Sequence, residues 1–126
     1  MNHPAYSSRV YLVLLAGAGL LAAPIVEGQQ RVVPDSATAK YVGQTVTVEG
    51  TVANVHVTRS GTTFLNFGSP YPNQTFTAVI FRSAASRFLN PQQWEGKRVR
   101  VTGTVQTFRG KPEIILEEPS QLITSR

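Results

Sequence analysis

Alternating apolar and polar residues between positions 45 and 57 predict a long first strand with a bend in it. The early valines of this segment share one parity, as expected of a strand with one buried face. Val55 and Val57 fall on the opposite parity, so the alternation slips by one residue. A β-bulge or sharp bend near Ala53 and Asn54 produces such a slip.

Four further strands and one short helix follow from the same kind of pattern. Ser83 is a favourable N-cap for the helix, whose apolar residues continue at helical spacing to Leu89, and Asn90-Pro91 ends it. Residues 119–123 are expected to add a short edge segment. The predicted strands after the first one cover residues 62–67, 75–81, 99–105 and 113–116.

One pattern occurs twice, at residues 41–52 and again at 94–105, with a constant offset of 53 positions. Each copy carries a mid-strand glycine, Gly50 or Gly103, where a side chain would block a close approach. Two copies are too few for a solenoid. They indicate instead two strands that each enter through a turn glycine and bend at the mid-strand glycine. Five strands with a helix between the third and fourth form the OB fold. The sequence therefore predicts an all-β, five-stranded OB-fold barrel closed by its first and fourth strands.

The N-terminal residues have the features of a secretory signal peptide. A polar start precedes the apolar run 10–23, which is shorter than the ~20 residues that a membrane-spanning helix needs. We expect export to the periplasm or the extracellular space, with cleavage after Gly28 or, alternatively, after Ala23. The expected organisation is a signal peptide at 1–28, a lead-in segment at 29–39 with a helical turn near Asp35, and an OB-fold domain at 40–123.

The chain is basic, with 12 lysines and arginines against 7 aspartates and glutamates and a formal net charge of +5. Removing the predicted signal peptide leaves this value unchanged, because Arg9 and Glu27 cancel. Such a balance favours polyanionic partners, namely nucleic acid, anionic lipid headgroups or acidic polysaccharides, although many exported proteins are basic without binding any of these. With 0 cysteines, the chain has no disulfide and no thiolate metal site.

Four motifs resemble those of a known family in their order and spacing. They are Gly43-x-x-Val46-x-Val48-x-Gly50-x-Val52, Gly61-Thr62-Thr63-Phe64-Leu65-Asn66-Phe67-Gly68, Gly96-x-x-Val99-x-Val101-x-Gly103-x-Val105 and Gly110-Lys111-Pro112-Glu113-Ile114-Ile115-Leu116. Over about residues 40–123 the chain resembles the bacterial OB-fold domains of the tRNA-anticodon and helicase type, which include exported, stand-alone members. The resemblance implies that single-stranded nucleic acid binds across the second and third strands, between the loops after strands one and four.

The chain departs from that family at the end of the second strand, where Phe67-Gly68-Ser69 replaces the usual acidic ending. A second exported OB group, the periplasmic stress-associated proteins, is similar to this chain in size and signal peptide. That similarity implies small-ligand binding, which is the alternative function. A protein-interaction module of the envelope is a third hypothesis.

Binding of single strands requires cations for the phosphates and aromatic faces for the bases. Arg59 in the first loop, and Arg109 with Lys111 in the loop between strands four and five, are expected to border one face. Arg98 and Arg100 have the parity opposite to the core valines of strand four and are expected to point outward. One of Phe64 and Phe67 is expected to lie in the core instead, and each arginine has a solvated surface charge as its alternative. The residues predicted to bind nucleic acid are Arg59, Phe64, Tyr71, Arg98, Arg100, Phe108, Arg109 and Lys111.

The sequence contains no recognisable catalytic constellation. No Ser-His-Asp set, paired carboxylates or phosphate-binding glycine loop is evident, and His56, the only histidine after the predicted signal peptide, is expected to be structural. We therefore expect a non-enzymatic protein without cofactor or metal. Its expected partner is single-stranded nucleic acid, such as extracellular DNA, bound without sequence specificity because stacking and phosphate contacts tolerate any base.

Overall fold

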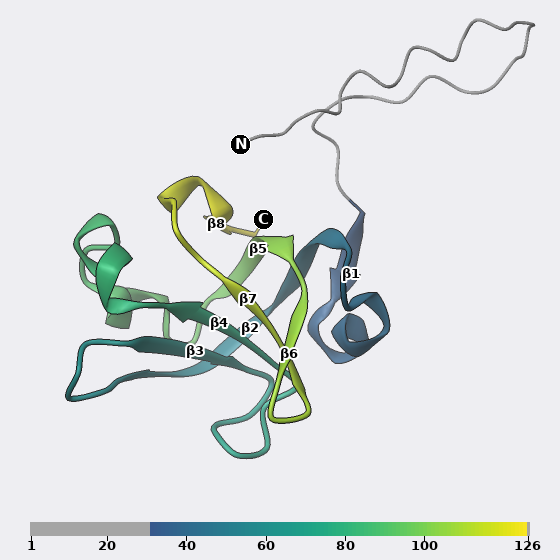
Figure 1. Cartoon of the computed structure of the whole chain (residues 1–126), viewed down its shortest axis with the longest axis horizontal. Coiled ribbons are helices and arrows are strands. Elements are labelled where there is room, and N and C mark those ends of the chain that lie inside the picture. The colour runs from purple at the N-terminus through teal and green to yellow at the C-terminus, as the bar shows by residue number, and fades with distance from the viewer. Residues whose placement is uncertain (1–30, 126) are drawn as a thin grey trace, which may run out of the picture.

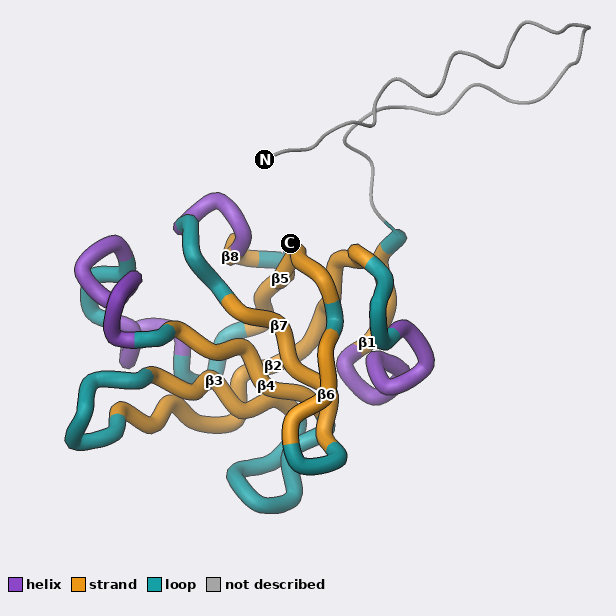
Figure 2. The backbone as a smooth tube through the Cα atoms, viewed as in Figure 1, coloured by secondary structure: helices purple, strands orange, loops and turns teal. Residues whose placement is uncertain are grey.

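The computed structural model describes residues 31–125, which form one curled sheet of eight strands with four short 3-10 helical segments around it (Figures 1 and 2). The strands are β1 (Val32–Pro34), β2 (Thr45–Val57), β3 (Thr63–Phe67), β4 (Phe76–Ile80), β5 (Arg98–Thr104), β6 (Gln106–Phe108), β7 (Lys111–Ile115) and β8 (Leu122–Thr124). The 3-10 segments are η2 (Asp35–Tyr41), η3 (Arg82–Arg87), η4 (Pro91–Trp94) and η5 (Pro119–Gln121). The predicted signal peptide and its cleavage site lie outside the described residues. Among residues 31–125, no helix is long and apolar enough to cross a membrane.

The strands are hydrogen-bonded in the order β6-β7-β4-β3-β2-β5-β8, and β1 adds to β2 in parallel. Only Val105 separates β5 from β6, yet β5 pairs with β2 while β6 pairs with β7. At Val105 the chain therefore leaves its pairing with β2, near one end of the strand order, and joins β7, near the other end. This crossing curls the sheet into an OB-like shape. The predicted pairing of the first and fourth strands is present, but the order is open and has eight strands rather than five.

A side chain links β5 to β7, which are not hydrogen-bonded neighbours in the strand order. The Nε2 of Gln121 donates to the carbonyl oxygens of Thr102 (3.0 Å) and Ile115 (3.2 Å). Its Oε1 accepts from the backbone N–H groups of Glu117 (2.7 Å) and Glu118 (2.9 Å). A primary amide has two donors and one acceptor oxygen. All of them are used, so Gln121 substitutes for part of a strand-to-strand ladder.

The long strand β2 bends where the sequence predicts. Its register against β3 shifts between Val52 and Asn54. Residues 45–51 pair with β5, and residues 54–57 pair with β3. Val52 is fully buried, and after the slip Val55 takes over the core-facing position. The bend therefore keeps apolar side chains inside along both halves of the strand.

The two mid-strand glycines lie at close approaches between segments, as predicted. A Cβ atom on Gly50 would lie 2.6 Å from Oδ1 of Asp35, and one on Gly103 would lie 2.5 Å from Cγ2 of Ile114. Both distances are far shorter than a carbon atom tolerates. Gly50 therefore lets the lead-in segment pack on β2, and Gly103 lets β7 pack closely on β5.

The predicted helix after Ser83 is replaced by two separate 3-10 segments. η3 begins at Arg82 with Phe81 in the N-cap position and no side-chain cap, so the prediction that Ser83 caps a helix is wrong. Asn90 has a left-handed φ of 48° and precedes Pro91, which starts η4. The segment is too short to propagate an α-helix, and 3-10 geometry is common in such connectors.

The core lies inside the curled sheet. The rings of Phe67 and Phe76 meet edge to face with their centroids 5.1 Å apart. Trp94 of η4 is half-buried against this core. The largest completely buried side chains are Phe67, Phe76, Leu65, Ile80, Ile114 and Leu116.

Gly103→Ala is expected to lower the free energy of unfolding by about 1–3 kcal/mol, because the added methyl group must displace the side chain of Ile114. Urea unfolding followed by the fluorescence of Trp94 measures the change. Thr107→Ala, in the exposed strand β6, is the control and is expected to change stability by less than about 0.5 kcal/mol. A Gly103→Ala protein as stable as the parent would show that the close approach of β7 to β5 is dispensable.

Candidate functional site

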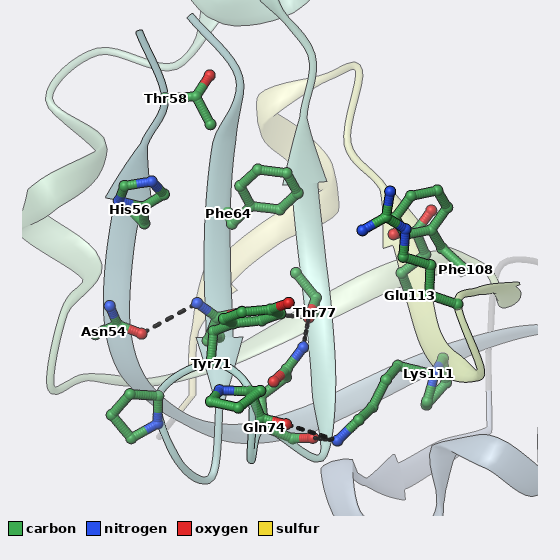
Figure 3. A pocket seen from close by; sticks show the side chains of 15 residues that line it. Asn54, His56, Thr58, Phe64, Tyr71, Gln74, Thr77, Phe108, Lys111 and Glu113 are labelled. Atoms are coloured by element: carbon green, nitrogen blue, oxygen red, sulfur yellow. Dashed lines mark hydrogen bonds between the residues drawn. The ribbon is translucent and has the colours of Figure 1, made fainter.

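A cavity of about 710 Å³ opens on the outer face of the sheet, where the second half of β2, β3, β4 and the β6–β7 hairpin surround it (Figure 3). Ligand-binding cavities in proteins typically measure about 300–1,000 Å³. The loop of residues 68–75, between β3 and β4, closes one side of it. We call this the outer-face cavity.

The bend in β2 decides which of its side chains reach the outer-face cavity. Asn54 and His56 line the cavity. Without the slip after Val52, both residues would share the parity of that buried valine and point into the core. On β3, the same alternation turns Phe64 and Asn66 towards the cavity. His56, expected to be structural, is exposed on this face.

The loop of residues 68–75 places an aromatic ring over the outer-face cavity. Tyr71 is 71% exposed, and Figure 3 shows its ring lying across the middle of the cavity, with the hydroxyl towards Thr77. The Nζ of Lys111 donates to the carbonyl oxygens of Pro72 (3.1 Å) and Gln74 (3.0 Å). These bonds fasten the loop to the β6–β7 hairpin.

The lead-in segment holds the same loop from its other side. The hydroxyl of Thr75 donates to Oδ2 of Asp35, in η2. A Cβ atom on Gly68 would lie 3.2 Å from the same carboxylate oxygen. Asp35 therefore packs against both ends of the loop that carries Tyr71.

The β6–β7 hairpin positions a second ring and a cation. Phe108 and Lys111 are paired across the hairpin, and the two turn residues, Arg109 and Gly110, have φ angles of 52° and 79°. Two consecutive positive φ angles are typical of the tight turns that suit twisted hairpins. The guanidinium carbon of Arg109 lies 5.1 Å from the centroid of the Phe108 ring, a cation–π geometry. Phe108 is 54% exposed, so its ring remains available to a ligand.

The structure brings together most, but not all, of the predicted site residues. Phe67 is fully buried and Phe64 faces the cavity, which confirms that one of the two belongs to the core. Arg59 is exposed in the turn between β2 and β3 and does not line the cavity, although Thr58 beside it does. The predicted residues that line the cavity are Phe64, Tyr71, Phe108, Arg109 and Lys111.

Arg98 and Arg100 point outward as predicted, but on the part of the sheet where β2 pairs with β5. Their Nε atoms lie 3.9 Å and 3.5 Å from Oε2 of Glu49. Glu49 and Arg100 are register partners. Neither arginine lines the outer-face cavity. Parity therefore predicted their exposure correctly, whereas a carboxylate on the neighbouring strand engages both charges.

The electrostatic environment of Glu49 favours its ionised form. A hydrogen bond from the hydroxyl of Ser125 and the charges of Arg100 and Arg98 hold the pKa of Glu49 below its ordinary value of 4.5, although desolvation opposes them. A carboxyl whose pKa is lower in the folded state stabilises the fold above the unfolded-state pKa. That contribution is lost as the pH falls through the folded-state pKa.

Glu49→Gln is therefore expected to weaken the dependence of stability on pH below about 4.5, because the variant has no carboxyl to protonate at this position. Thermal melts at a series of pH values from neutral to about 3 measure this dependence. The control is Glu117→Gln, which changes an exposed carboxylate. If parent and Glu49→Gln lose stability in parallel as the pH falls, the assigned role of Glu49 is wrong.

Sequence reasoning missed a group of polar side chains at the floor of the outer-face cavity. The alternation along β3 could have found Asn66, because it shares the parity of Phe64. Nothing in the sequence indicated that Glu113 would be 7% exposed, since its burial depends on β4 and β6 lying on either side of β7. The missed polar residues are Asn54, Asn66, Gln74, Thr77 and Glu113.

Lys111→Met is expected to speed amide hydrogen exchange in residues 70–75, because the loop loses its two side-chain bonds to the hairpin. Mass spectrometry of exchanged peptides measures the rates. Lys97→Met removes the same charge from an exposed position outside the cavity and should leave the loop unchanged. Equal exchange in parent and Lys111→Met would contradict a positioning role for Lys111.

Comparisons with known proteins identify the fold. Neither a protein-family model nor a curated protein matches the chain. A solved structure described as an aspartyl-tRNA synthetase from Leishmania major Friedlin matches with a TM-score of 0.51 and 12% identity, over 85% of this chain and 22% of that one. Aspartyl tRNA synthetase from Entamoeba histolytica has a TM-score of 0.49 and 15% identity, over 76% and 23%. This chain thus spans less than a quarter of either synthetase, and the Leishmania match shows a similarity of fold alone. The fold and cavity define an OB-like β domain with an aromatic-lined outer face.

Proposed function

We propose that this chain binds single-stranded nucleic acid in the outer-face cavity. The observation that carries the proposal is the convergence of three aromatic rings on one cavity from three separate elements, namely Phe64 of β3, Tyr71 of the loop and Phe108 of β6 (Figure 3). Stacking of a base on such a ring contributes about 1–3 kcal/mol. Tyr71 and Phe108 are both more than half exposed, so a strand could reach them without rearrangement of the core.

The cations beside the rings have different roles in this proposal. Arg109 forms no salt bridge within residues 31–125, so its guanidinium is available to a phosphate. Lys111 donates to two carbonyl oxygens and holds the Tyr71 loop. We therefore assign a phosphate contact to Arg109 and a positioning role to Lys111, and keep Arg59 as a peripheral contact.

The similarity of fold gives independent support for a polynucleotide ligand. An aspartyl-tRNA synthetase acts, by its name, on tRNA, and part of the Leishmania protein shares the fold of this chain. The net charge of +5 favours the same class of ligand. In this proposal the chain acts by binding alone, without catalysis or a cofactor.

The signal-like residues 1–28 support export, so the proposed ligand is one that occurs in the periplasm or outside the cell, such as extracellular DNA. A second candidate function is the binding of a small ligand. It is favoured by the cavity volume of about 710 Å³, which lies within the range of small-molecule sites. The two candidates differ in their response to salt, because only a polyanionic strand releases several counterions when it binds.

Binding of a labelled oligo-dT to the purified protein, followed by fluorescence anisotropy at low and near-physiological salt, tests the proposal. Tyr71→Ala is expected to weaken binding about tenfold, since one stacked base is lost. Arg109→Ala is expected to weaken binding and to reduce the log–log salt slope by about 0.7, the value of one single-strand phosphate contact. Lys97→Ala removes an exposed charge outside the cavity and should leave the affinity and the slope nearly unchanged.

Absence of saturable binding at low salt would refute the proposed function. Binding that is the same in Arg109→Ala and in Lys97→Ala would place the strand elsewhere on the molecule. A salt-independent response to a small molecule, with no response to oligo-dT, would favour the second candidate function.

A further inference from the structure

A row of polar side chains crosses the sheet, one from each of five neighbouring strands, and four of the five line the floor of the outer-face cavity. Three of its members, Asn66, Thr77 and Glu113, are exposed by only 3%, 5% and 7%. Polar side chains are rarely this buried on a sheet face unless they have partners. In register order the row consists of Asn54 on β2, Asn66 on β3, Thr77 on β4, Glu113 on β7 and Gln106 on β6.

Hydrogen bonds link the polar side chains of the floor to one another and leave one buried acceptor without a donor. Asn66 Nδ2 donates to Asn54 Oδ1 (3.1 Å), and Thr77 Oγ1 donates to Asn66 Oδ1 (3.3 Å). Gln74 Nε2 donates to Thr77 Oγ1 (3.4 Å). The other end of the Gln74 amide, Oε1, is buried and accepts no hydrogen bond within residues 31–125.

Glu113 is the charged member of this floor. Its Oε2 accepts from Gln106 Nε2 at 2.8 Å, and its Oε1 has no donor among residues 31–125. Within the same residues the salt bridges all involve Glu49, so no cation pairs with Glu113. Oε1 of Glu113 is not among the buried atoms that lack a partner, so this oxygen keeps contact with solvent at the outer-face cavity. A ligand with N–H donors could replace that water as its hydrogen-bond donor, whereas a phosphate would be repelled.

We propose that Glu113 is a specificity-determining residue that accepts hydrogen bonds from one unstacked base, and that guanine is the preferred base. The inference rests on the proposed function, because it names the base that the same cavity takes. Guanine alone among the DNA bases presents two adjacent donors, N1–H and the exocyclic N2–H₂, which match the paired oxygens of a carboxylate. Cytosine and adenine offer an exocyclic amine beside an acceptor nitrogen, and thymine offers one N–H between two carbonyl oxygens. Binding then depends on base identity, contrary to the sequence-based prediction of tolerance.

The test compares a labelled dT 12-mer with the same 12-mer carrying one central guanine, on the unchanged protein. The guanine oligonucleotide is expected to bind about tenfold more tightly, as one bidentate base contact predicts. Glu113→Gln preserves the size of the side chain and a partner for Gln106, but removes the charge. We expect it to abolish the guanine preference while the dT 12-mer binds at least as tightly as before. Glu117→Gln removes the same charge from an exposed residue outside the cavity and should retain the preference.

The outcomes separate this inference from the proposed function. Equal affinity of the unchanged protein for both oligonucleotides would overturn the role of Glu113 and leave nucleic-acid binding intact. A guanine preference that persists in a folded Glu113→Gln protein would overturn the assignment to Glu113. Failure of both oligonucleotides to bind at low salt would overturn the proposed function and this inference together. The primary comparison uses the unchanged protein, so it holds even if circular dichroism shows that Glu113→Gln does not fold.

Discussion

The bend of β2 between Val52 and Asn54 is the constraint on which both the core and the cavity depend. One strand of 13 residues pairs with β5 before the bend and with β3 after it. The slip in parity keeps Val55 inside and turns Asn54 towards the cavity. A regular strand would instead bury an amide among apolar side chains and expose a valine, and both changes are unfavourable.

The parity of apolar residues and the spacing of glycines predicted those features of the fold that depend on the backbone at one point in the chain. The parity slip located the bend, and the repeated spacing of Gly50 and Gly103 located the close approaches, because each signal reflects the backbone at that point. The break at Val105 was not predicted. Its N–H donates to the carbonyl of Gln44 (2.9 Å) and its own carbonyl accepts from Gly43 (2.8 Å), so a segment distant in sequence determines where β5 ends.

The same distinction explains which site residues were found. Tyr71 lies in a loop and Phe108 directly before a tight turn, and prolines and glycines mark both places in the sequence. The family resemblance indicated which face of the sheet they border. Alternation showed that Arg98 and Arg100 point outward, but a curled sheet has several outward-facing parts. Only the register with Glu49 shows that their part lies away from the cavity. Lys111 was found as a cation of the site, whereas its bonds to the loop became visible only in three dimensions.

Under the proposed function, the net charge of +5 explains how a polyanion is attracted towards the molecule, but not where it binds. Screened attraction acts over about 8–10 Å at ordinary ionic strength, so every surface cation contributes to approach. Both signs of charge line the outer-face cavity: Arg109 lies in the hairpin turn, and Glu113, which forms no salt bridge within residues 31–125, lies in the floor. Under the proposed function, a strand that entered backbone first would bring phosphates towards that carboxylate. A strand that enters with its bases inward places phosphates near Arg109, rings against bases and N–H donors over Glu113. The arrangement of charges would therefore orient the strand before any base is distinguished.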